Sequence, residues 1–193
     1  MKMNLPVSGR EYTFPDNVRI VTTTDVRSFV TYANPDFLEI SGFTEAELIG
    51  QPHNVVRHPD MPPLAFADLW AAIRAGQSWM GMVKNRRKNG DHYWVDAFVT
   101  PILEDGQVVG YQSVRVCPER EHVASAEKVY AKLNKNAGKN PGKNPAGGLL
   151  PLLSYLPLKA KVIATSLCCY LAAAGVVTLL SSADTSAGSP LLQ

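Results

Sequence analysis

The sequence predicts an α+β domain in which a five-stranded antiparallel sheet carries short helices on one face. Three observations support this fold class. Two short β-rich runs come first, the helical segments follow as a single block, and three longer strand patterns joined by turns complete the domain. Because strands and helices do not alternate, the order excludes a parallel sheet built from βαβ units. Such a sheet can enclose a pocket between its inner face and the helices, where we expect a ligand.

The first elements are two strands and a short helix. Residues 19–24 and 28–33 are rich in β-branched side chains and are separated by three residues, which suits a hairpin. Asn34 stands directly before a proline, which predicts a helix N-cap followed by proline in the first turn. This helix, residues 35–41, is expected to end at Gly42.

Two further helices complete the helical block. Thr44, with Glu47 three residues later, forms a capping box that predicts a second short helix. Asp60 is placed to cap a longer helix over Pro62–Ala75. Gly76 then stands where a residue with left-handed backbone is expected after the helix.

Three strands are predicted after the helices, at Ser78–Arg86, His92–Leu103 and Val108–Cys117. The first two are joined by Asn89 and Gly90, the favoured pair for a tight hairpin turn. This turn lies in KNRRKNG, the densest cluster of positive charge in the chain. Because acidic residues flank the cluster and the domain is near neutral, no extended basic face is available, and a nucleic-acid partner is not expected.

The side chains of the first of these strands alternate between two faces. Trp79, Gly81 and Asn85 share one face, and Lys84 and Arg86 share the other. This face suits a flat ligand ring with a polar edge. The indole can pack against the ring, the glycine leaves space for it, and the amide can both donate and accept hydrogen bonds. We therefore assign this face to the pocket, which places the two basic side chains on the outside of the domain, either solvated or facing a partner.

The region after the sheet predicts an amphipathic output helix over 118–133, with apolar residues at helical spacing: Val123, Ala126, Tyr130 and Leu133. Residues 134–148 are rich in Asn, Gly, Pro and Lys, which predicts a flexible linker. Residues 1–18 are expected to form an N-terminal cap on the domain.

An apolar run near the C-terminus predicts a membrane anchor. Residues 162–180 carry no charge, and their length matches a helix that crosses a hydrocarbon core of roughly 30 Å. A buried core helix is the alternative. An apolar juxtamembrane segment, 149–161, precedes the run and a short tail, 181–193, follows it. Lysines lie upstream and only Asp184 is charged downstream, so the positive-inside rule places the domain in the cytoplasm, at the inner membrane.

Residues 19–117 resemble a PAS domain, and more narrowly the FAD-binding PAS domain of bacterial aerotaxis receptors. The resemblance rests on GQPHNVVRHPDMP at 50–62, on the run from Trp79 to Asp91, and on HYWV at 92–95. It implies a membrane-bound sensor that holds FAD without a covalent bond and reports redox state or oxygen for aerotaxis. It also implies a homodimer and an output to a HAMP or chemoreceptor signalling domain or a chemotaxis kinase complex. The tail is too short for those domains, so we expect either a piece of a longer receptor or output through a partner.

Eight candidate cofactor-binding residues follow from the residues and the resemblance: Asn34, His53, Arg57, His58, Asp60, Trp79, Asn85 and Arg115. Asn85 and Arg115 match or lie near flavin-contacting positions of the related light-oxygen-voltage proteins. Asn34 matches a residue near the cofactor in the aerotaxis family, and a helix cap explains it equally well.

Four of these candidates lie in one short segment, residues 53–60, which is expected to run from a loop into a helix. His53, Arg57 and His58 are suited to meet the FAD diphosphate, as the resemblance implies. Asp60 is negative and is expected to cap a helix or to hold Arg57. The segment contains no cysteine, so a thiol photoadduct with a flavin is excluded and electron transfer remains.

Two alternatives stay open. A haem or small-ligand PAS sensor would use His53 or His58 as a ligand, and a cofactor-free PAS module would serve only protein interaction. The sequence has no nucleophile with a base, no paired acids and no phosphate loop, so we expect neither an enzyme nor a catalytic residue. No cysteine or third histidine is suitably spaced for zinc, so no metal site is expected.

Overall fold

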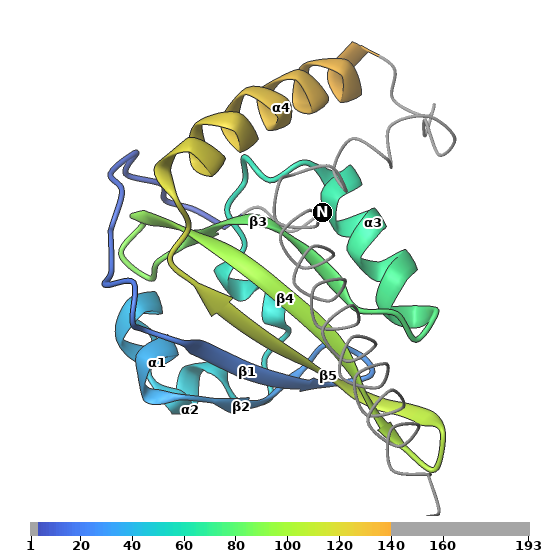
Figure 1. The fold of residues 1–193 in the computed structure, drawn as a ribbon. Helices are drawn as coiled ribbons and strands as arrows, with labels where there is room; N and C mark the ends of the chain where they lie inside the picture. The colour runs from blue at the N-terminus through green and yellow to red at the C-terminus, as the bar shows by residue number, and fades with distance from the viewer. Residues whose placement is uncertain (1–3, 140–193) are drawn as a thin grey trace, which may run out of the picture. The chain divides into compact units, whose positions relative to one another are not determined.

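The computed structural model describes residues 4–139 of the 193-residue chain. Five strands form one antiparallel sheet in the order β2-β1-β5-β4-β3 (Figure 1). Their bounds are β1 Ile20–Asp25, β2 Val30–Ala33, β3 Trp79–Arg86, β4 His92–Glu104 and β5 Gln107–Val116. The predicted α+β class and antiparallel sheet are confirmed, and every strand end lies within two residues of its predicted position.

The helical segments between β2 and β3 form one block, as predicted. They are α1 (Pro35–Ser41), α2 (Glu45–Leu48), the 3-10 turn η1 (His53–Val56) and α3 (Pro63–Arg74). Helix α1 packs near β1, α2 near β2, and α3 near β3 and β4 (Figure 1). Of these segments, η1 and α3 border the pocket described below, together with the inner face of the sheet.

The first two helices begin at the cap residues that the sequence predicted. Asn34 Oδ1 accepts a hydrogen bond from the backbone N–H of Phe37 at 3.1 Å, and Gly42 ends α1 with a φ of 72°. Glu47 accepts from the backbone N–H of Thr44 at 3.0 Å at the start of α2. Both predicted caps are confirmed.

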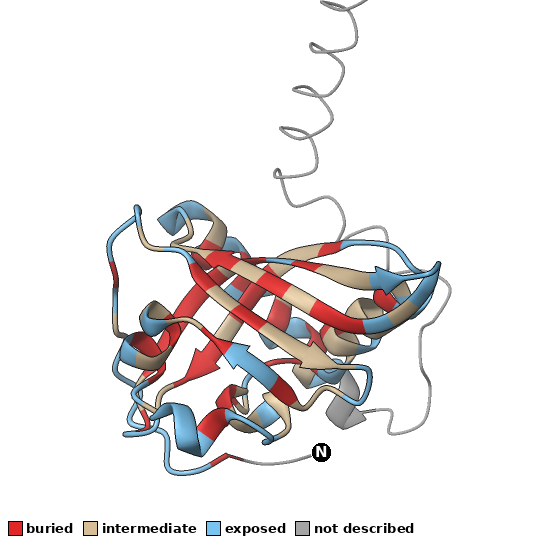
Figure 2. Cartoon of the chain, turned by 90° about the horizontal axis from the view of Figure 1, so that it is seen from below, coloured by how far each residue is buried: buried red, intermediate tan, exposed pale blue. Residues whose placement is uncertain are grey.

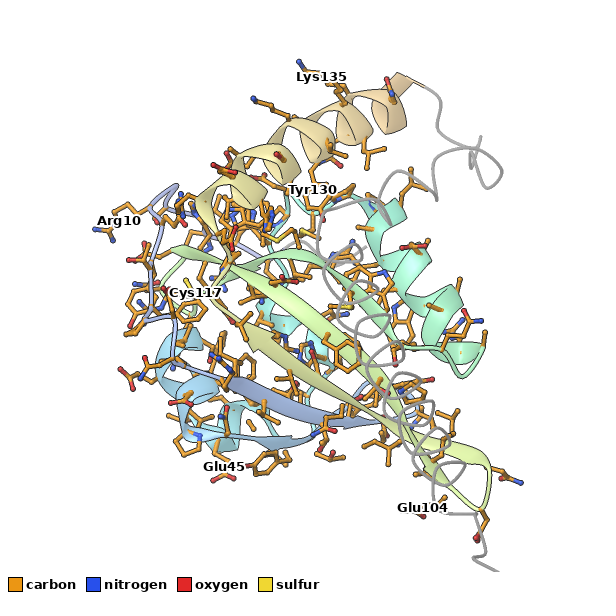
Figure 3. All side chains as sticks on the ribbon, viewed as in Figure 1. Arg10, Glu45, Glu104, Cys117, Tyr130 and Lys135 are labelled. Carbon is orange, nitrogen blue, oxygen red and sulfur yellow. The ribbon has the colours of Figure 1, made fainter. Side chains whose placement is uncertain are left out.

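Helix α4 (Arg120–Lys139) lies over the outer face of the sheet and contacts β3. It buries the side chains predicted at helical spacing: Val123, Ala126, Tyr130 and Leu133. The Tyr130 hydroxyl donates to the Met82 carbonyl oxygen at 2.6 Å, and its ring lies 6.1 Å from that of Trp94 between centroids. Figure 3 shows Tyr130 pointing from α4 toward the sheet and Lys135 pointing away from it.

Helix α4 continues six residues into the segment that was predicted to be a linker. Residues 134–139 contain no proline, and their single glycine, Gly138, weakens a helix by about 1 kcal/mol relative to alanine without stopping one that is already nucleated. The rest of the predicted linker, the juxtamembrane segment, the span at 162–180 and the tail lie outside the described residues. Within 4–139, no helix is long and apolar enough to cross a membrane.

The N-terminal segment covers one edge of the sheet at the β3–β4 hairpin. The carbonyl oxygens of Leu5 and Pro6 accept hydrogen bonds from Arg86 at 3.1 and 2.7 Å. Arg86 therefore faces away from the cavity, as predicted, but it is covered by the N-terminal segment and is only 7% exposed, so it is not solvated. Lys84, also predicted on the outside, has a side chain that is 13% exposed. Figure 2 shows that most buried residues lie along the strands, while the turns and the middle of β2 are exposed.

Candidate functional site

A cavity of about 390 Å³ lies where the pocket was predicted, between the inner face of the sheet, η1 and α3. Side chains from β1, β3, β4 and β5 form one wall, and side chains from η1, α3 and the adjoining loops form the other. Small-molecule sites in proteins usually measure about 300–1,000 Å³. The cavity is therefore large enough for a fused ring system and lies at the small end of that range.

Five of the eight candidate residues line this cavity: His53, Arg57, Trp79, Asn85 and Arg115. They come from η1, the loop after it, β3 and β5. The fold therefore brings together residues that are far apart in the sequence, because the helical block between β2 and β3 packs against the sheet. Contact between these five residues and a cofactor remains a prediction.

Arg115 is a buried cation at the cavity wall. Its side chain is 4% exposed, and its Nη2 donates to the Thr22 hydroxyl at 3.1 Å and to His53 Nε2 at 2.8 Å. Its Nη1 is buried without a hydrogen-bond partner among the described residues. Burial lowers the pKa of the Arg115 guanidinium to about 10, so the group stays charged at neutral pH. A ligand with an acceptor or negative charge would offset this unpaired donor.

His53 is held neutral by these surroundings. A guanidinium nitrogen only donates, so His53 Nε2 accepts from Arg115, and the neutral ring carries its proton on Nδ1. Burial, followed by the charge of Arg115, lowers the pKa of His53 to about 3. The ring also lies nearly parallel to that of Phe37, with the centroids 6.1 Å apart.

Trp79 and Gly81 form a packed pair on the cavity face of β3. The Trp79 indole Nε1 donates to Asp68 Oδ2 of α3 at 2.9 Å. A Cβ added at Gly81 would lie 2.6 Å from the Trp79 ring. The space over Gly81, which we expected to accommodate a ligand ring, is therefore occupied by the indole. Asn85 also lies on this face, opposite Tyr93 in the β3–β4 register, and is 4% exposed.

The charged side chains that line the cavity are all basic among the described residues. Four arginines line it, and no aspartate or glutamate is present among the described lining residues: Arg27, Arg57, Arg74 and Arg115. The Arg57 guanidinium stacks over the Phe66 ring of α3 at 3.7 Å, and its buried Nε and Nη2 have no hydrogen-bond partner in the part of the chain that the structure describes. Such a lining favours an electron-rich or anionic ligand.

Asn34 does not line the cavity, because its amide is used within the fold. Besides capping α1, Asn34 Oδ1 accepts from the backbone N–H of Val21 at 3.0 Å. Its Nδ2 donates to the carbonyl oxygen of Arg19 at 2.7 Å. Asn34 thus fastens α1 to β1, which agrees with the helix-cap interpretation.

His58 and Asp60 also lie outside the cavity. His58 is 3% exposed, and its ring meets that of His92 edge to face at 5.6 Å. Asp60 forms an ion pair with Lys84 at 2.7 Å, so the expectation that it holds Arg57 is wrong. The expectation that Asp60 caps the third helix is also wrong, because Pro62 occupies the N-cap position without a side-chain bond.

The cavity includes residues that the sequence reasoning missed. Tyr111 and Ser113 line it from β5, and the period-two alternation from Arg115 identifies both. Arg27, in the turn after β1, and Arg74, in the last turn of α3, line it from positions exposed to solvent. No local pattern marks these two, because exposed arginines are common in turns and at helix ends.

Comparison with known proteins agrees with this architecture. Residues 30–115 match the family model described as the PAS fold. The aerotaxis receptor of Escherichia coli (strain K12) is 50% identical over 119 residues, which cover 62% of this chain and 24% of the receptor. The nitrogen fixation regulatory protein of Klebsiella pneumoniae is 29% identical over 96 residues, 49% of this chain and 19% of that protein. The chain thus spans about a quarter or less of these relatives.

A solved structure of a light-oxygen-voltage domain, studied with a flavin analogue, has the same fold. It superposes with a TM-score of 0.51 at 21% identity and covers 61% of this chain and 87% of that one. The order of strands, the cavity, the family match and the identity with the receptor all lead to one assignment. The chain contains a PAS domain, matched over residues 30–115, and is similar in this region to the aerotaxis receptor of Escherichia coli.

Proposed function

We propose that this protein is a membrane-tethered PAS sensor that binds FAD non-covalently and reports redox state or oxygen for aerotaxis. The observation that supports a flavin most directly is the cavity with Arg115 in its wall. Its buried charge lacks a carboxylate partner among the described residues, and its Nη1 lacks a hydrogen-bond acceptor. The oxygen- and nitrogen-rich edge of a flavin ring supplies such an acceptor.

The residues present fit a flavin in several respects. Asn85 offers an amide that both donates and accepts, while Val83, Val99 and Ile73 give the cavity apolar walls for the ring. When bound, a flavin supplies reversible electron transfer and changes its charge and hydrogen bonding on reduction. Arg115 ties the cavity to β1 through Thr22 and to η1 through His53. A change of charge in the ligand would therefore alter the electrostatic interactions of both β1 and η1. A sensor needs such a coupling to shift between two conformations.

The receptor setting is proposed from the relative and from the sequence beyond the described residues. The 50% identity with the aerotaxis receptor supports signalling in aerotaxis rather than enzymatic turnover. The uncharged run at 162–180 supports an inner-membrane anchor, and the lysines before it support a cytoplasmic domain. We further propose a homodimer that acts on a HAMP or chemoreceptor signalling domain or a chemotaxis kinase complex.

The absorption spectrum of the full chain, purified in detergent from flavin-replete cells, tests the cofactor. We expect a yellow protein whose acid-released cofactor elutes with FAD in chromatography, and bleaching of the visible bands by a reductant. A colourless protein would contradict the flavin and favour the interaction module, and a Soret band would favour haem. Fractionation of cells into membrane and soluble pools, with and without residues 162–180, tests the anchor separately.

A further inference from the structure

Helix α4 carries a line of lysines on the side that points away from the sheet. Lys128, Lys132 and Lys135, which we call the lysine stripe, are all exposed, and Figure 3 shows Lys135 pointing away from the sheet. Their spacing of four and three residues places them on one side of an α-helix. The buried side chains of α4 occupy the opposite side and pack toward the sheet: Val123, Ala126, Tyr130 and Leu133.

The stripe lacks the acidic neighbours that a solvated helix face usually has. Within residues 4–139, none of its three lysines forms an ion pair. No acidic residue occurs in the sequence between Lys128 and Asp184. Lys128 and Lys132 are four residues apart, and like charges at this spacing destabilise a helix. The helix dipole does not offset this cost, because its effect is confined to the last turn and both lysines lie before it.

Contacts at both ends fix α4 to the PAS domain. Near the start of the helix, the Arg120 guanidinium donates to both carboxylate oxygens of Glu11, at 2.5 and 3.0 Å. Near its end, the Asn134 side-chain amide donates to the carbonyl oxygen of Asp60 at 2.7 Å. A surface that binds the stripe would therefore hold the whole domain in one orientation.

The chain beyond α4 indicates which kind of surface the stripe meets. The 22 residues 140–161 separate α4 from the uncharged run at 162–180 that we propose as an anchor. Even fully extended, such a chain spans at most about 80 Å. The same stretch adds three further lysines and no acid: Lys143, Lys159 and Lys161. An anchored chain therefore keeps the stripe near the cytoplasmic leaflet, which is rich in anionic lipids.

We propose that the lysine stripe binds the anionic headgroups of the inner leaflet and lays the PAS domain on the membrane surface. The inference rests on the proposed anchor, which keeps the bilayer close, and adds a second contact that is purely electrostatic. The stripe extends about 10 Å along the helix, so α4 would lie parallel to the bilayer. Because α4 covers the outer face of the sheet, the cavity then lies on the side away from the membrane.

Energy transfer from tryptophan to a dansyl-labelled lipid tests this contact in the full chain, reconstituted into vesicles. All three tryptophans lie in the PAS domain, at positions 70, 79 and 94, so the transfer reports how close the domain lies to the bilayer. The vesicles contain phosphatidylcholine alone or an equimolar mixture with phosphatidylglycerol. We expect more transfer in the mixture, and a return to the value in neutral lipid at about 0.5 M NaCl, where charges are screened within about 5 Å.

The variant K128Q/K132Q is compared with the control R19Q/K88Q, which removes the same charge from exposed residues outside α4. Each lysine near an anionic leaflet raises the bound population about fivefold. K128Q/K132Q should therefore lower the ratio of docked to undocked domain about 25-fold, while the control should match wild type. Thermal unfolding of both variants should equal that of wild type, because the substituted side chains are exposed.

The outcomes separate this inference from the proposed function. Equal transfer in neutral and anionic vesicles, or an equal loss of transfer in both variants, overturns the lysine stripe and leaves the anchor standing. The first of these results would assign the stripe to an acidic protein partner instead. A chain that is recovered only with anionic vesicles and is released by salt supports the stripe and overturns the anchor. A chain recovered with neither lipid overturns both.

Discussion

Two buried arginines on opposite faces of the sheet have different surroundings. Arg86, on the outer face of β3, donates to three backbone carbonyl oxygens, those of Leu5, Pro6 and Lys88. Arg115, on the inner face of β5, donates to Thr22 and His53 through one nitrogen, and its Nη1 has no partner between residues 4 and 139. Within the described residues, no carboxylate forms an ion pair with either arginine.

This difference separates a charge that holds the fold together from one that is left available for a ligand. Neutral carbonyl oxygens share the charge of Arg86 and connect the N-terminal segment to the β3–β4 hairpin. A buried donor without a partner lowers stability, so the position of Arg115 costs free energy in the empty protein. Substitutions at the two sites should therefore affect different measurements.

The largest effect is expected at Arg115. Arg115→Gln removes the cation from the cavity, and we expect flavin affinity to fall about 10- to 100-fold, as for a lost charged hydrogen bond. The unfolding free energy of the flavin-free protein should change by less than about 1 kcal/mol, because losing an uncompensated buried charge offsets two lost hydrogen bonds. Flavin titration and urea unfolding measure the two quantities. A stability loss without an affinity loss would contradict a ligand-binding Arg115.

Arg86 provides the opposite expectation. Arg86→Met leaves three carbonyl oxygens without their donor, and we expect the unfolding free energy to fall by about 2–3 kcal/mol. Flavin affinity of the folded protein should stay within about twofold, because Arg86 does not line the cavity. Lys88→Ala serves as the control, since its side chain is half exposed and its ion pair with Glu47 lies at the surface. An unchanged urea midpoint in Arg86→Met would show that the N-terminal contacts do not stabilise the domain.

The pH dependence of stability tests whether His53, the hydrogen-bond partner of Arg115, is neutral in the folded protein. The folded pKa of His53 is lowered to about 3 from 6.5, so the unfolded chain binds more protons between these values. Stability is therefore complete above pH 6.5 and is lost as the pH falls. When the pH is lowered from about 7 to about 5, the unfolding free energy of wild type should fall by up to about 2 kcal/mol more than that of His53→Gln, which lacks the titrating ring. Parallel curves for the two proteins would mean that the ring is not held neutral.

The smallest effect is expected at α4, on the other side of the sheet from the cavity. Tyr130→Phe removes the hydroxyl that donates to Met82 at 2.6 Å while keeping the ring beside Trp94. We expect a loss of about 1 kcal/mol in unfolding free energy, measured by urea denaturation. The visible spectrum of the bound flavin should not change. A shifted spectrum would show that α4 is coupled to the cavity through β3.

The sequence allowed much of the fold to be predicted, because its elements are specified locally. Caps and turn glycines marked the helix ends at Asn34, Gly42 and Thr44, and these predictions were confirmed. Strand alternation placed Asn85 and Trp79 on the cavity face, which was also correct. Alternation along β5 would have added Tyr111, so that omission was avoidable.

Local patterns, read from the sequence alone, thus determined the α+β class with its antiparallel sheet, the caps of the first two helices and the side of β3 that faces the pocket. The tertiary structure decided the surroundings of individual charges. It buried Arg86 under the N-terminal segment, paired Asp60 with Lys84, and placed Arg115 against His53. These contacts join residues more than twenty positions apart, and a charged side chain carries no local signal of which partner the fold will bring to it.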